Sequence, residues 1–401
     1  MTAPSSVKER RQLARHALQL RIDIENVRTR GRVRTTTGDF HSRGVFVQVL
    51  PPDTVEKDTL HVSFVDAPSP GVCVAQCQHA DARGAGLSLK EVPESTRAFL
   101  RSLTSAGLTI DGYRLTHYLS SGGMAQVYLA QHPSGVPVVL KRLLPHFARE
   151  PSALELFTSE AELLRRCDHA GLPKFHDVKQ LDDVFFLAME WISGFSLDST
   201  LERFGALPVP AARAILLQLL RTLDYLHHLP ISKQRTLSVH HGDISPQNIM
   251  LTPDGRVVLI DLGACSSDLT PRPPGFEILG TLPYMAPEII NGHQPHTASE
   301  LWSVGCVFFE MLTGVRPFEG EDDFETVELI TTGVFDTPHV EDYGPLDEQI
   351  LRRTLAPRAM SSRDFGYETA RDLVDTLLER SDELSDRRAL RDYLAQASRS
   401  P

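Results

Sequence analysis

Three oxygen-bearing side chains lie close enough in the sequence to bind one metal-bound phosphate together. Asp243 and Asn248 stand in one apolar run, and Asp261 ends the next one. The pair Asp254-Gly255 between these runs is typical of a hairpin turn, which would bring the three side chains to one end of a short ribbon. Carboxylate and amide oxygens suit a hard cation such as Mg²⁺ with phosphates attached. A purely structural explanation would need three independent coincidences.

A second group of residues, further upstream, has types that suit phosphate binding. The run from Leu119 to Leu129 contains Ser-Ser-Gly-Gly, whose backbone N–H groups can approach phosphate oxygens without interference from Cβ atoms. Lys141 ends an apolar strand, and Glu160 lies on a helix from which it could pair with that lysine. Each feature alone has an ordinary explanation, because hairpin tips are often glycine-rich and strand-end lysines commonly extend into solvent.

The elements that must position these residues follow from the periodicity of the apolar side chains. Strand-like runs extend from Tyr113 to about Leu144, and helical periodicity dominates after them. The expected helices span Ala153–Arg166, Ala211–Leu229, Ala298–Thr313 and Ala370–Glu379. Strands followed by helices predict an α+β domain with two lobes. The charged segment Ser381–Pro401 is expected to fray.

The N-terminal part of the sequence has a different pattern. Short β-rich runs between Arg21 and Leu89 are separated by Gly, Pro or Asp, which predicts a small all-β barrel. The segment Glu94–Leu108 places apolar side chains on one helical face, and a domain boundary near residues 105–110 follows. We expect residues 1–108 to form the barrel with its C-terminal helix, 109–380 the two-lobed domain (small lobe about 109–190, large lobe about 191–380) and 381–401 a charged tail.

Composition and charge exclude several classes of protein. Of the 401 residues, 41% are hydrophobic and 23% charged, which excludes a disordered or collagen-like chain. No apolar run is long enough to cross a bilayer, so we expect a cytoplasmic protein without a membrane span. The five cysteines are an odd number at wide spacings, and we expect them to be reduced. Residues 1–105 carry 15 Lys and Arg against 11 Asp and Glu, whereas the whole chain carries 41 against 52. The acidic remainder argues against a nucleic-acid partner.

Together, the motifs between Tyr113 and Glu379 resemble those of a eukaryotic-type Ser/Thr protein kinase. The resemblance implies a two-lobed α+β fold that binds ATP with Mg²⁺, or with Mn²⁺ in its place. It also implies that Asp243 is the catalytic base and that Asn248 and Asp261 are metal ligands. Protein substrates with Ser or Thr are the partners expected from it.

The same resemblance implies an ATP site made of residues from both lobes. Lys141 would hold the α- and β-phosphates with Glu160 as its ion-pair partner, so both count with Asp243 as catalytic residues. The purine would lie between apolar side chains and face the backbone of the hinge, where Met189 is the gatekeeper. The nucleotide-binding residues implied in this way, besides Lys141, are Ser120, Gly122, Gly123, Val127, Val139, Met189, Glu190, Ile192 and Met250.

The segment Gly280–Glu288 resembles the end of a kinase activation segment, and Arg363 is placed like the arginine that pairs with Glu288. Thr281 is expected to touch the catalytic loop. Because Gly242 replaces the arginine that usually anchors a phosphorylated activation loop, activity is not expected to depend on phosphorylation of that loop.

Other positions also depart from the kinase pattern. Ser120 replaces the first glycine of the phosphate loop, and Ser245 replaces a lysine that neutralises the γ-phosphate. Each lost charge contact could weaken transition-state stabilisation by roughly a few kcal/mol. Glu300 replaces an aspartate that braces the catalytic loop, and its longer side chain can still accept the same backbone hydrogen bonds. An active kinase is the favoured interpretation, and the alternative is a pseudokinase scaffold whose N-terminal domain docks partner proteins.

Short motifs in the first domain carry a second resemblance. Arg11 and Arg15 lie four residues apart, so two guanidinium forks can face the same side. Asp39, His41 and Gly44 follow the pattern Asp/Asn-x-Ser-x-x-Gly, with His41 at the serine position. With the strand meander, these motifs make about residues 7–105 similar to a PilZ domain. That family is a six-stranded barrel that binds the bacterial second messenger cyclic di-GMP.

The PilZ resemblance implies a ligand site and a role in signalling. Arg11 and Arg15 would hold phosphate and guanine, while Asp39, His41 and Gly44 would line the floor of the site. Because an imidazole is bulkier than a hydroxyl, we expect weak affinity, and the alternative is a ligand-free module that docks proteins. The two domains together predict a bacterial signalling kinase whose barrel senses cyclic di-GMP or docks a partner.

Overall fold

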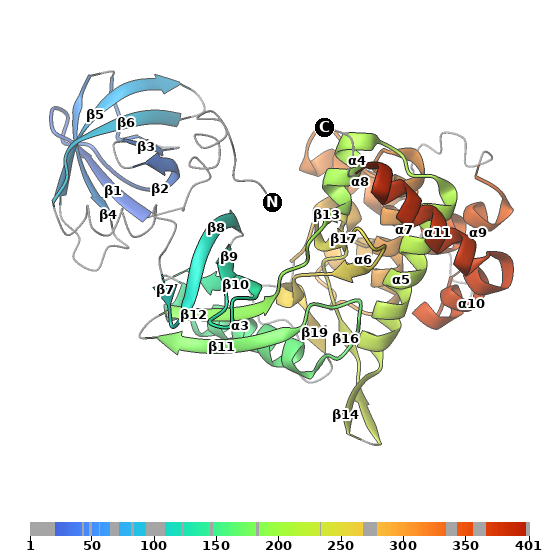
Figure 1. Ribbon diagram of the computed structural model, residues 1–401. Coiled ribbons are helices and arrows are strands. Elements are labelled where there is room, and N and C mark those ends of the chain that lie inside the picture. Colours follow the sequence, from blue (N-terminus) through green and yellow to red (C-terminus); the bar gives the residue numbers. More distant parts are fainter. Residues whose placement is uncertain are drawn as a thin grey trace. The chain divides into compact units, whose positions relative to one another are not determined.

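The computed structural model describes residues 21–41, 44–47, 50–55, 57–64, 72–81, 84–93, 109–121, 124–144, 147–181, 184–232, 234–267, 279–333, 343–355 and 366–397. The chain divides into two compact units: residues Met1–Leu154 with Asp177–Met189, and residues Glu155–His176 with Glu190–Pro401. Figure 1 shows strands throughout the first unit and mostly helices in the second. The division falls inside the two-lobed domain expected over residues 109–380, because the first unit also contains residues 109–154 and 177–189, and the boundary expected near residues 105–110 stays a prediction.

The first unit begins with a closed barrel of six antiparallel strands in the order β1-β2-β3-β6-β5-β4. The strands are β1 (Arg21–Asn26), β2 (Arg32–His41), β3 (Gly44–Val47), β4 (Thr59–Phe64), β5 (Val72–Asp81) and β6 (Gly84–Glu91). Alternate side chains point inward, as in a strand with one buried face, and the buried ones include Ile22, Ile24, Leu60, Val62 and Cys73. The barrel expected from the strand pattern is therefore present. The helix expected over Glu94–Leu108 lies outside the described residues.

Four arginines in the basic stretch of the barrel form ion pairs with acidic side chains. Arg28 pairs with Asp58 at 2.9 Å, and Arg34 pairs with Asp23 at 2.7 Å. Glu25 accepts ion pairs from two further arginines, Arg30 at 3.3 Å and Arg32 at 2.9 Å. Each of these four arginines thus has an acidic partner, and the three carboxylates leave one positive charge in excess.

A second sheet follows, with six strands in the order β11-β12-β10-β9-β8-β7. The strands are β7 (Thr109–Ile110), β8 (Tyr113–Ser121), β9 (Ala125–Gln131), β10 (Pro137–Leu143), β11 (Phe175–Leu181) and β12 (Val184–Glu190). One face of β9 and β10 is buried, through Tyr128, Ala130, Val138 and Leu140. The neighbouring positions on the opposite face are only half-buried. That face therefore stays accessible to a ligand.

The second unit is built around two helices whose sides are almost all buried, α5 (Val209–His227) and α7 (Thr297–Thr313). Helix α3 (Pro151–Arg166) begins in the first unit and continues into the second. The other helices are α4 (Leu197–Phe204), α6 (Pro287–Ile290), α8 (Asp323–Thr332), α9 (Pro345–Thr354), α10 (Ala370–Arg380) and α11 (Glu383–Ala397). The four helices expected from the sequence are confirmed within a few residues at each end.

Short ribbons and turns connect these helices. In one ribbon, β17 (Ile249–Leu251) lies between β13 (Phe195–Ser196) and β18 (Val257–Leu259). Two further ribbons pair β14 (Leu229–Ser232) with β15 (Arg235–Leu237) and β16 (Val239–His240) with β19 (Ser266–Ser267). The 3₁₀ turns are η1 (Phe147–Arg149), η2 (Pro246–Asn248), η3 (Leu262–Ala264) and η4 (Leu282–Tyr284). Within the described ranges, no helix combines the length and the apolar character that a membrane span requires.

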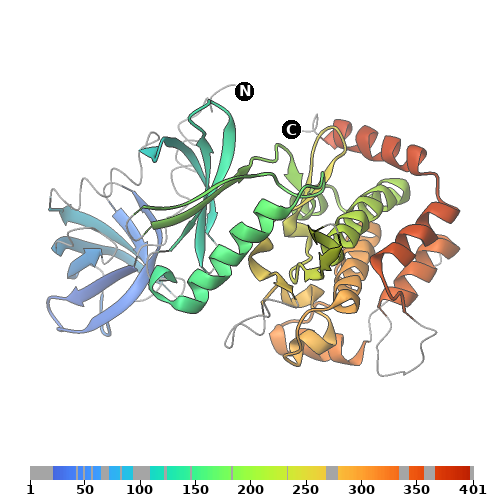
Figure 2. The same cartoon turned by 90° about the horizontal axis from the view of Figure 1, so that it is seen from below.

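The C-terminal segment does not fray over its described part. Residues Glu383–Ala397 form α11, which packs along α5 (Figures 1 and 2). Leu390 and Leu394 are buried, and Glu383 forms two hydrogen bonds of 2.6 and 2.9 Å with Arg221 of α5. The expectation of a frayed tail is therefore wrong, because the many charged residues hide an apolar stripe at helical spacing.

Candidate active site

Asn248 and Asp261 lie at the same end of one hairpin. Strands β17 and β18 are antiparallel neighbours, and Gly255 in their turn has φ 85°, a left-handed value that glycine adopts without strain. Asn248 directly precedes β17, and its carbonyl accepts a hydrogen bond of 2.8 Å from the N–H of Ile260, the residue before Asp261. The hairpin stands where the sequence predicts it and brings these two positions together.

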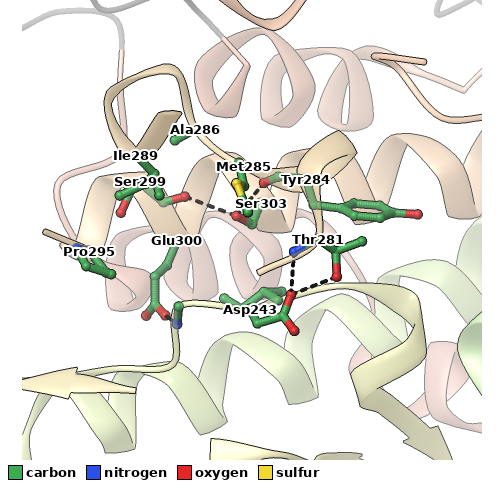
Figure 3. Close-up of a pocket in the computed structure, with 12 residues that line it drawn as sticks. Asp243, Thr281, Tyr284, Met285, Ala286, Ile289, Pro295, Ser299, Glu300 and Ser303 are labelled. Atoms are coloured by element: carbon green, nitrogen blue, oxygen red, sulfur yellow. Dashed lines mark hydrogen bonds between the residues drawn. The ribbon is translucent and has the colours of Figure 1, made fainter. Parts of the chain in front are cut away.

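The carboxylate of Asp243 is held by donors on both of its oxygens, and Figure 3 shows the two hydrogen bonds from Thr281. Asn248 Nδ2 donates to Asp243 Oδ2 at 2.8 Å and to the Asp243 carbonyl at 2.9 Å. The backbone N–H and the hydroxyl of Thr281 both donate to Oδ1 at 2.9 Å. A carboxylate oxygen has two lone pairs, so Oδ2 keeps one for an incoming hydroxyl while the side chain stays fixed in orientation. The contact that we expected from Thr281 is confirmed.

The backbone next to Asp243 is hydrogen-bonded to a buried acid, Glu300. Glu300 Oε1 accepts a hydrogen bond of 2.9 Å from the N–H of Gly242, and its Oε2 lies 2.6 Å from Nε2 of His227. Burial alone would raise the pKa of the Glu300 carboxyl, but the hydrogen bond with His227 and the charges around it outweigh burial and lower the pKa below its usual value. The longer side chain at position 300 does reach the loop, as expected.

Two local features place this support. Helix α7, which carries Glu300, begins with a reciprocal cap in which His296 Nδ1 accepts from the Ser299 N–H at 3.1 Å and the Ser299 hydroxyl oxygen accepts from the His296 N–H at 2.9 Å. Gly242 has φ 76°, a left-handed backbone that favours glycine. The replacement of the usual arginine by Gly242 therefore removes a charge and also relieves the backbone at this turn.

A small pocket lies beside Asp243 and Thr281 (Figure 3). Tyr284, Met285 and Ile289 are among its lining residues, and its volume is about 20 Å³. That is room for about one water molecule. The space holds no substrate side chain as it stands.

The side chains of Asn248 and Asp261 fit a hard cation. Because Asn248 Nδ2 is committed to Asp243, its amide oxygen is the group left for a metal ion. Asp261 is exposed and has a left-handed backbone (φ 66°). Its Oδ1 accepts a hydrogen bond of 3.2 Å from the N–H of Gly263. Among the described residues, no group of three or more His, Cys, Asp or Glu is placed to hold a metal. An ion here would need further oxygen ligands, which phosphates and water supply.

In the first unit, the predicted nucleotide-binding residues fall on one face of the sheet. Ser120 on β8 is paired in register with Val127 on β9, which is paired in turn with Lys141 on β10. Val127, Val139 and Lys141 share the half-buried face opposite the core side chains. Three neighbouring strands thus present a row of positions toward one surface. Gly122 and Gly123 of the same site lie outside the described residues.

The remaining predicted site residues lie at the end of the first unit and in the second unit, and they differ in burial. Glu160 is buried on α3, and Ile192 is buried just after β12. The backbone N–H of Glu190 donates to the Lys174 carbonyl at 2.8 Å, and its carboxylate bonds Arg256 at 2.7 Å. The Glu190 N–H is therefore engaged within the chain and not available to a purine. Met189 is buried at the end of the first unit, Met250 is half-buried on β17, and the pairing of Lys141 with Glu160 remains a prediction.

Residues 113–396 match the family described as the protein kinase domain. The chain belongs to the protein kinase family. The chain is 30% identical over 275 residues to "Tyrosine-protein kinase MasK" of Myxococcus xanthus, and this match covers 66% of this chain and 42% of that protein. It is 34% identical over 269 residues to "Serine/threonine-protein kinase PknA" of Mycobacterium tuberculosis, which covers 65% of this chain and 60% of that protein.

A third relative of the kinase domain is "Serine/threonine-protein kinase PknH" of Mycobacterium tuberculosis, at 30% identity over 252 residues, or 62% of this chain and 37% of that protein. The chain spans less than two thirds of the length of each of these three relatives. The family match begins at residue 113, so it leaves the barrel outside and includes α11.

The sequence did not predict the role of His227, and it did not predict the burial of Ser245. His227 is the last residue of α5 and lies 73 positions before its partner Glu300, so no local pattern signals the pair. Ser245 is fully buried, and its hydroxyl has no hydrogen-bond partner within the described part of the chain. It therefore cannot present a polar group to phosphate in the way a lysine would. Arg363 lies outside the described residues, and Glu288 is 3.4 Å from His296.

Proposed function

We propose that this chain transfers the γ-phosphoryl group of ATP to Ser or Thr hydroxyl groups of proteins. The observation that carries the proposal is the orientation of Asp243 by Asn248 and Thr281 from opposite sides of the carboxylate. Two of the three relatives described above are named Ser/Thr kinases and one is named a tyrosine kinase. The choice of Ser and Thr over Tyr follows the majority of these names and the motif resemblance.

The residues present divide the work of phosphoryl transfer among them. Asp243 Oδ2 accepts the proton of the substrate hydroxyl while the new oxygen–phosphorus bond forms and the bond to the leaving ADP oxygen breaks. Lys141 holds the α- and β-phosphates, and Glu160 orients that lysine. Asn248 and Asp261 would hold Mg²⁺, which supplies charge neutralisation on the phosphates when bound. Most of the rate gain comes from positioning and charge, which is why fixed side chains matter here.

The decisive test compares Asp243→Asn with a matched change outside the site, Asp254→Asn. Asp254 is exposed in the hairpin turn, where it accepts a hydrogen bond from Thr252. We expect Asp243→Asn to lower transfer of labelled phosphate from ATP by about 10³-fold, while ATP binding persists and Asp254→Asn stays near wild type. Lys141→Met should weaken both transfer and ATP binding. Equal rates in the two Asn variants would refute the assigned base.

The alternative function is a pseudokinase scaffold, which Ser120, Gly242 and the buried Ser245 favour. It predicts no phosphate transfer to the chain itself or to generic protein substrates such as casein. It also predicts ATP binding that is no tighter than in Lys141→Met. Both results together would replace the enzyme by the scaffold.

For the barrel, we propose weak binding of cyclic di-GMP that changes the kinase rate. Asp39 and His41 lie near the end of β2, and His41 is paired in register with Gly44 at the start of β3, so the three positions share one hairpin. A closed barrel of six strands supports this assignment. Arg11 and Arg15 lie outside the described residues. The docking alternative is a barrel whose surface binds another protein and no nucleotide.

A further inference from the structure

The segment that follows the expected hinge, residues 190–192, is attached to the hairpin β17–β18 through its backbone. Strand β13 pairs in register with β17, with Ser196 opposite Met250 (Figure 1). Gly194 lies so close to the same strand that a Cβ atom there would overlap the carbonyl oxygen of Leu251. The chain just beyond the hinge is therefore held against the hairpin.

An ion pair adds a second link at the hinge itself. Arg256 Nη2 donates to Glu190 Oε1 at 2.7 Å, and the two side chains are 29% and 23% exposed. The other carboxylate oxygen, Glu190 Oε2, accepts a hydrogen bond of 3.1 Å from the N–H of Lys174. Both oxygens of Glu190 are thus engaged, and one of their partners belongs to the hairpin.

The backbone of Arg256 is itself fixed in the turn of the hairpin. The N–H of Thr252 donates to the Arg256 carbonyl and the Thr252 hydroxyl oxygen accepts from the Arg256 N–H, both at 3.0 Å. Gln218 of α5 holds the residues on either side, because its Nε2 donates to the Gly255 carbonyl at 3.0 Å and its Oε1 accepts from the Val257 N–H at 3.3 Å. The guanidinium group therefore extends from a backbone that is held on both sides.

We propose that Arg256 is a positioning residue for the nucleotide and acts through Glu190. By holding Glu190, it fixes the hinge backbone that is expected to face the purine relative to Asn248 and Asp261, which stand at the other end of the same hairpin. The proposal rests on the proposed function, because it concerns the nucleotide bound at that site. Arg256 itself touches no reacting atom in this role.

The expected effect is on nucleotide affinity and not on turnover. The spacing of hinge and hairpin serves the bound nucleotide and the transition state alike, so its loss should raise the KM for ATP and leave turnover within about twofold. For Arg256→Ala, we expect the KM for ATP to rise and the affinity for ADP to fall by about 5-fold each, the upper end of what a partly exposed ion pair contributes.

The matched control is Arg221→Ala. Arg221 lies 2.6 Å from Glu383, and these side chains are 34% and 27% exposed, so the pair resembles that of Arg256 and Glu190 but stands outside the expected site. Titration calorimetry of the full-length chain with ADP and Mg²⁺ should give wild-type affinity for Arg221→Ala. A structural role alone would lower the thermal unfolding temperature of both variants similarly and leave both ADP affinities unchanged. Equal ADP affinities in the two variants would overturn the proposal.

Conservative and double variants show whether Arg256 acts through Glu190. Because the pair is made by one nitrogen and one oxygen, Arg256→Lys should keep ADP affinity within about twofold of the wild type. In a chain that already carries Glu190→Ala, Arg256→Ala should cause no further loss, because its partner is gone. A further loss of about 5-fold in that chain would overturn the proposal. Should Arg256→Ala not fold, Arg256→Gln, which keeps part of the aliphatic stem without the charge, replaces it in each comparison.

Phosphate transfer separates this proposal from the proposed function. A wild type that binds ADP but transfers no phosphate would refute the proposed function, and the ADP titrations would still decide the role of Arg256. A wild type that transfers phosphate, with unchanged ADP affinity in Arg256→Ala, would refute the positioning role alone. A loss of turnover in Arg256→Ala as large as the change in KM would also overturn that role, because the pair would then act mainly in the transition state.

Discussion

The catalytic region around Asp243 and the N-terminal barrel bury opposite kinds of side chain. In the catalytic region, Glu300 and His227 are buried and hydrogen-bonded to each other, and Glu300 also supports the backbone of Gly242. Among the barrel residues that the structure describes, the buried side chains are apolar apart from Asn26. Four arginines of the barrel, Arg28, Arg30, Arg32 and Arg34, are exposed and form ion pairs on its surface.

This difference indicates which region needs its backbone held in one position. Burying a charged carboxylate rarely adds stability relative to apolar packing, so such an acid is expected where it fixes the position of another group. Here it fixes the loop that carries Asp243. Exposed ion pairs contribute about 0–1 kcal/mol and fix little. The barrel core is therefore a scaffold, and any ligand specificity must come from its hairpins and from residues 1–20.

The largest effect is expected from removing the buried acid. Glu300→Ala leaves His227 buried without its partner and the Gly242 N–H without its acceptor, so the free energy of unfolding should fall by about 3 kcal/mol or more. The turnover number should fall as well, with a smaller change in the KM for ATP. Urea denaturation and steady-state kinetics measure the two effects.

The control for Glu300→Ala is Glu383→Ala, which breaks the partly exposed pair with Arg221. It should lower the free energy of unfolding by no more than about 1 kcal/mol and leave the turnover number unchanged. Similar losses in the two variants would remove the distinction between the buried support and an ordinary surface pair.

The same carboxylate adds a pH dependence of known sign. Its pKa is lower in the folded chain than the ordinary value of 4.5, so the charged form stabilises the fold above that pH. This stabilisation is lost as the pH falls from 4.5 through the lower folded-state value. The stability difference between wild type and Glu300→Gln should therefore be constant above about pH 5.5 and shrink below pH 4.5.

The next largest effect is expected at Thr281. Thr281→Ala removes the hydroxyl that donates to Asp243 Oδ1 but leaves the backbone N–H in place. A hydrogen bond to a charged group is worth about 1.5–3 kcal/mol, so turnover should fall by roughly 10- to 100-fold with little change in ATP affinity. Thr281→Ser keeps the donor and should restore most of the rate. Failure of serine to restore it would show that the methyl group, and not the hydrogen bond, is what matters.

A smaller effect is expected from the barrel. Calorimetric titration of the full chain with cyclic di-GMP should give weak binding that weakens further as salt rises, because the ligand is a dianion. Arg11→Ala and Arg15→Ala should abolish binding, whereas Arg34→Ala, which removes an arginine already paired with Asp23, should change it little. If no binding heat is measured at high ligand concentration, or if the affinity is unchanged in Arg11→Ala and Arg15→Ala, the docking alternative replaces the cyclic di-GMP proposal.

The sequence predicts the parts of this molecule whose chemistry restricts the residue type. Asp243 and Asn248 could be singled out because the proposed base and metal ligand need particular atoms, and Asp254-Gly255 predicted the hairpin that aligns Asn248 with Asp261. The support by His227 could not be found, because its partner is 73 residues away and a buried histidine has many ordinary roles. Helix α11 was missed because its charged face outweighs its apolar stripe in composition.

The smallest effect is expected from the phosphorylatable residues that follow Asp261. Anchoring a phosphate takes a cation close to the catalytic loop, and position 242, where kinases usually supply an arginine, holds a glycine that donates its N–H to Glu300. We therefore expect less than about a twofold change in the turnover number for each of Ser266→Ala, Ser267→Ala and Thr270→Ala. Thr270 lies outside the described residues.

Thr281→Ala is the matched contrast in the same segment, because its hydroxyl bonds Asp243 directly. Mass spectrometry of the purified chain before and after phosphatase treatment shows whether the first three positions carry phosphate at all. A large loss of turnover in Ser266→Ala or Thr270→Ala, together with phosphate at that position, would mean that a cation other than residue 242 anchors the segment.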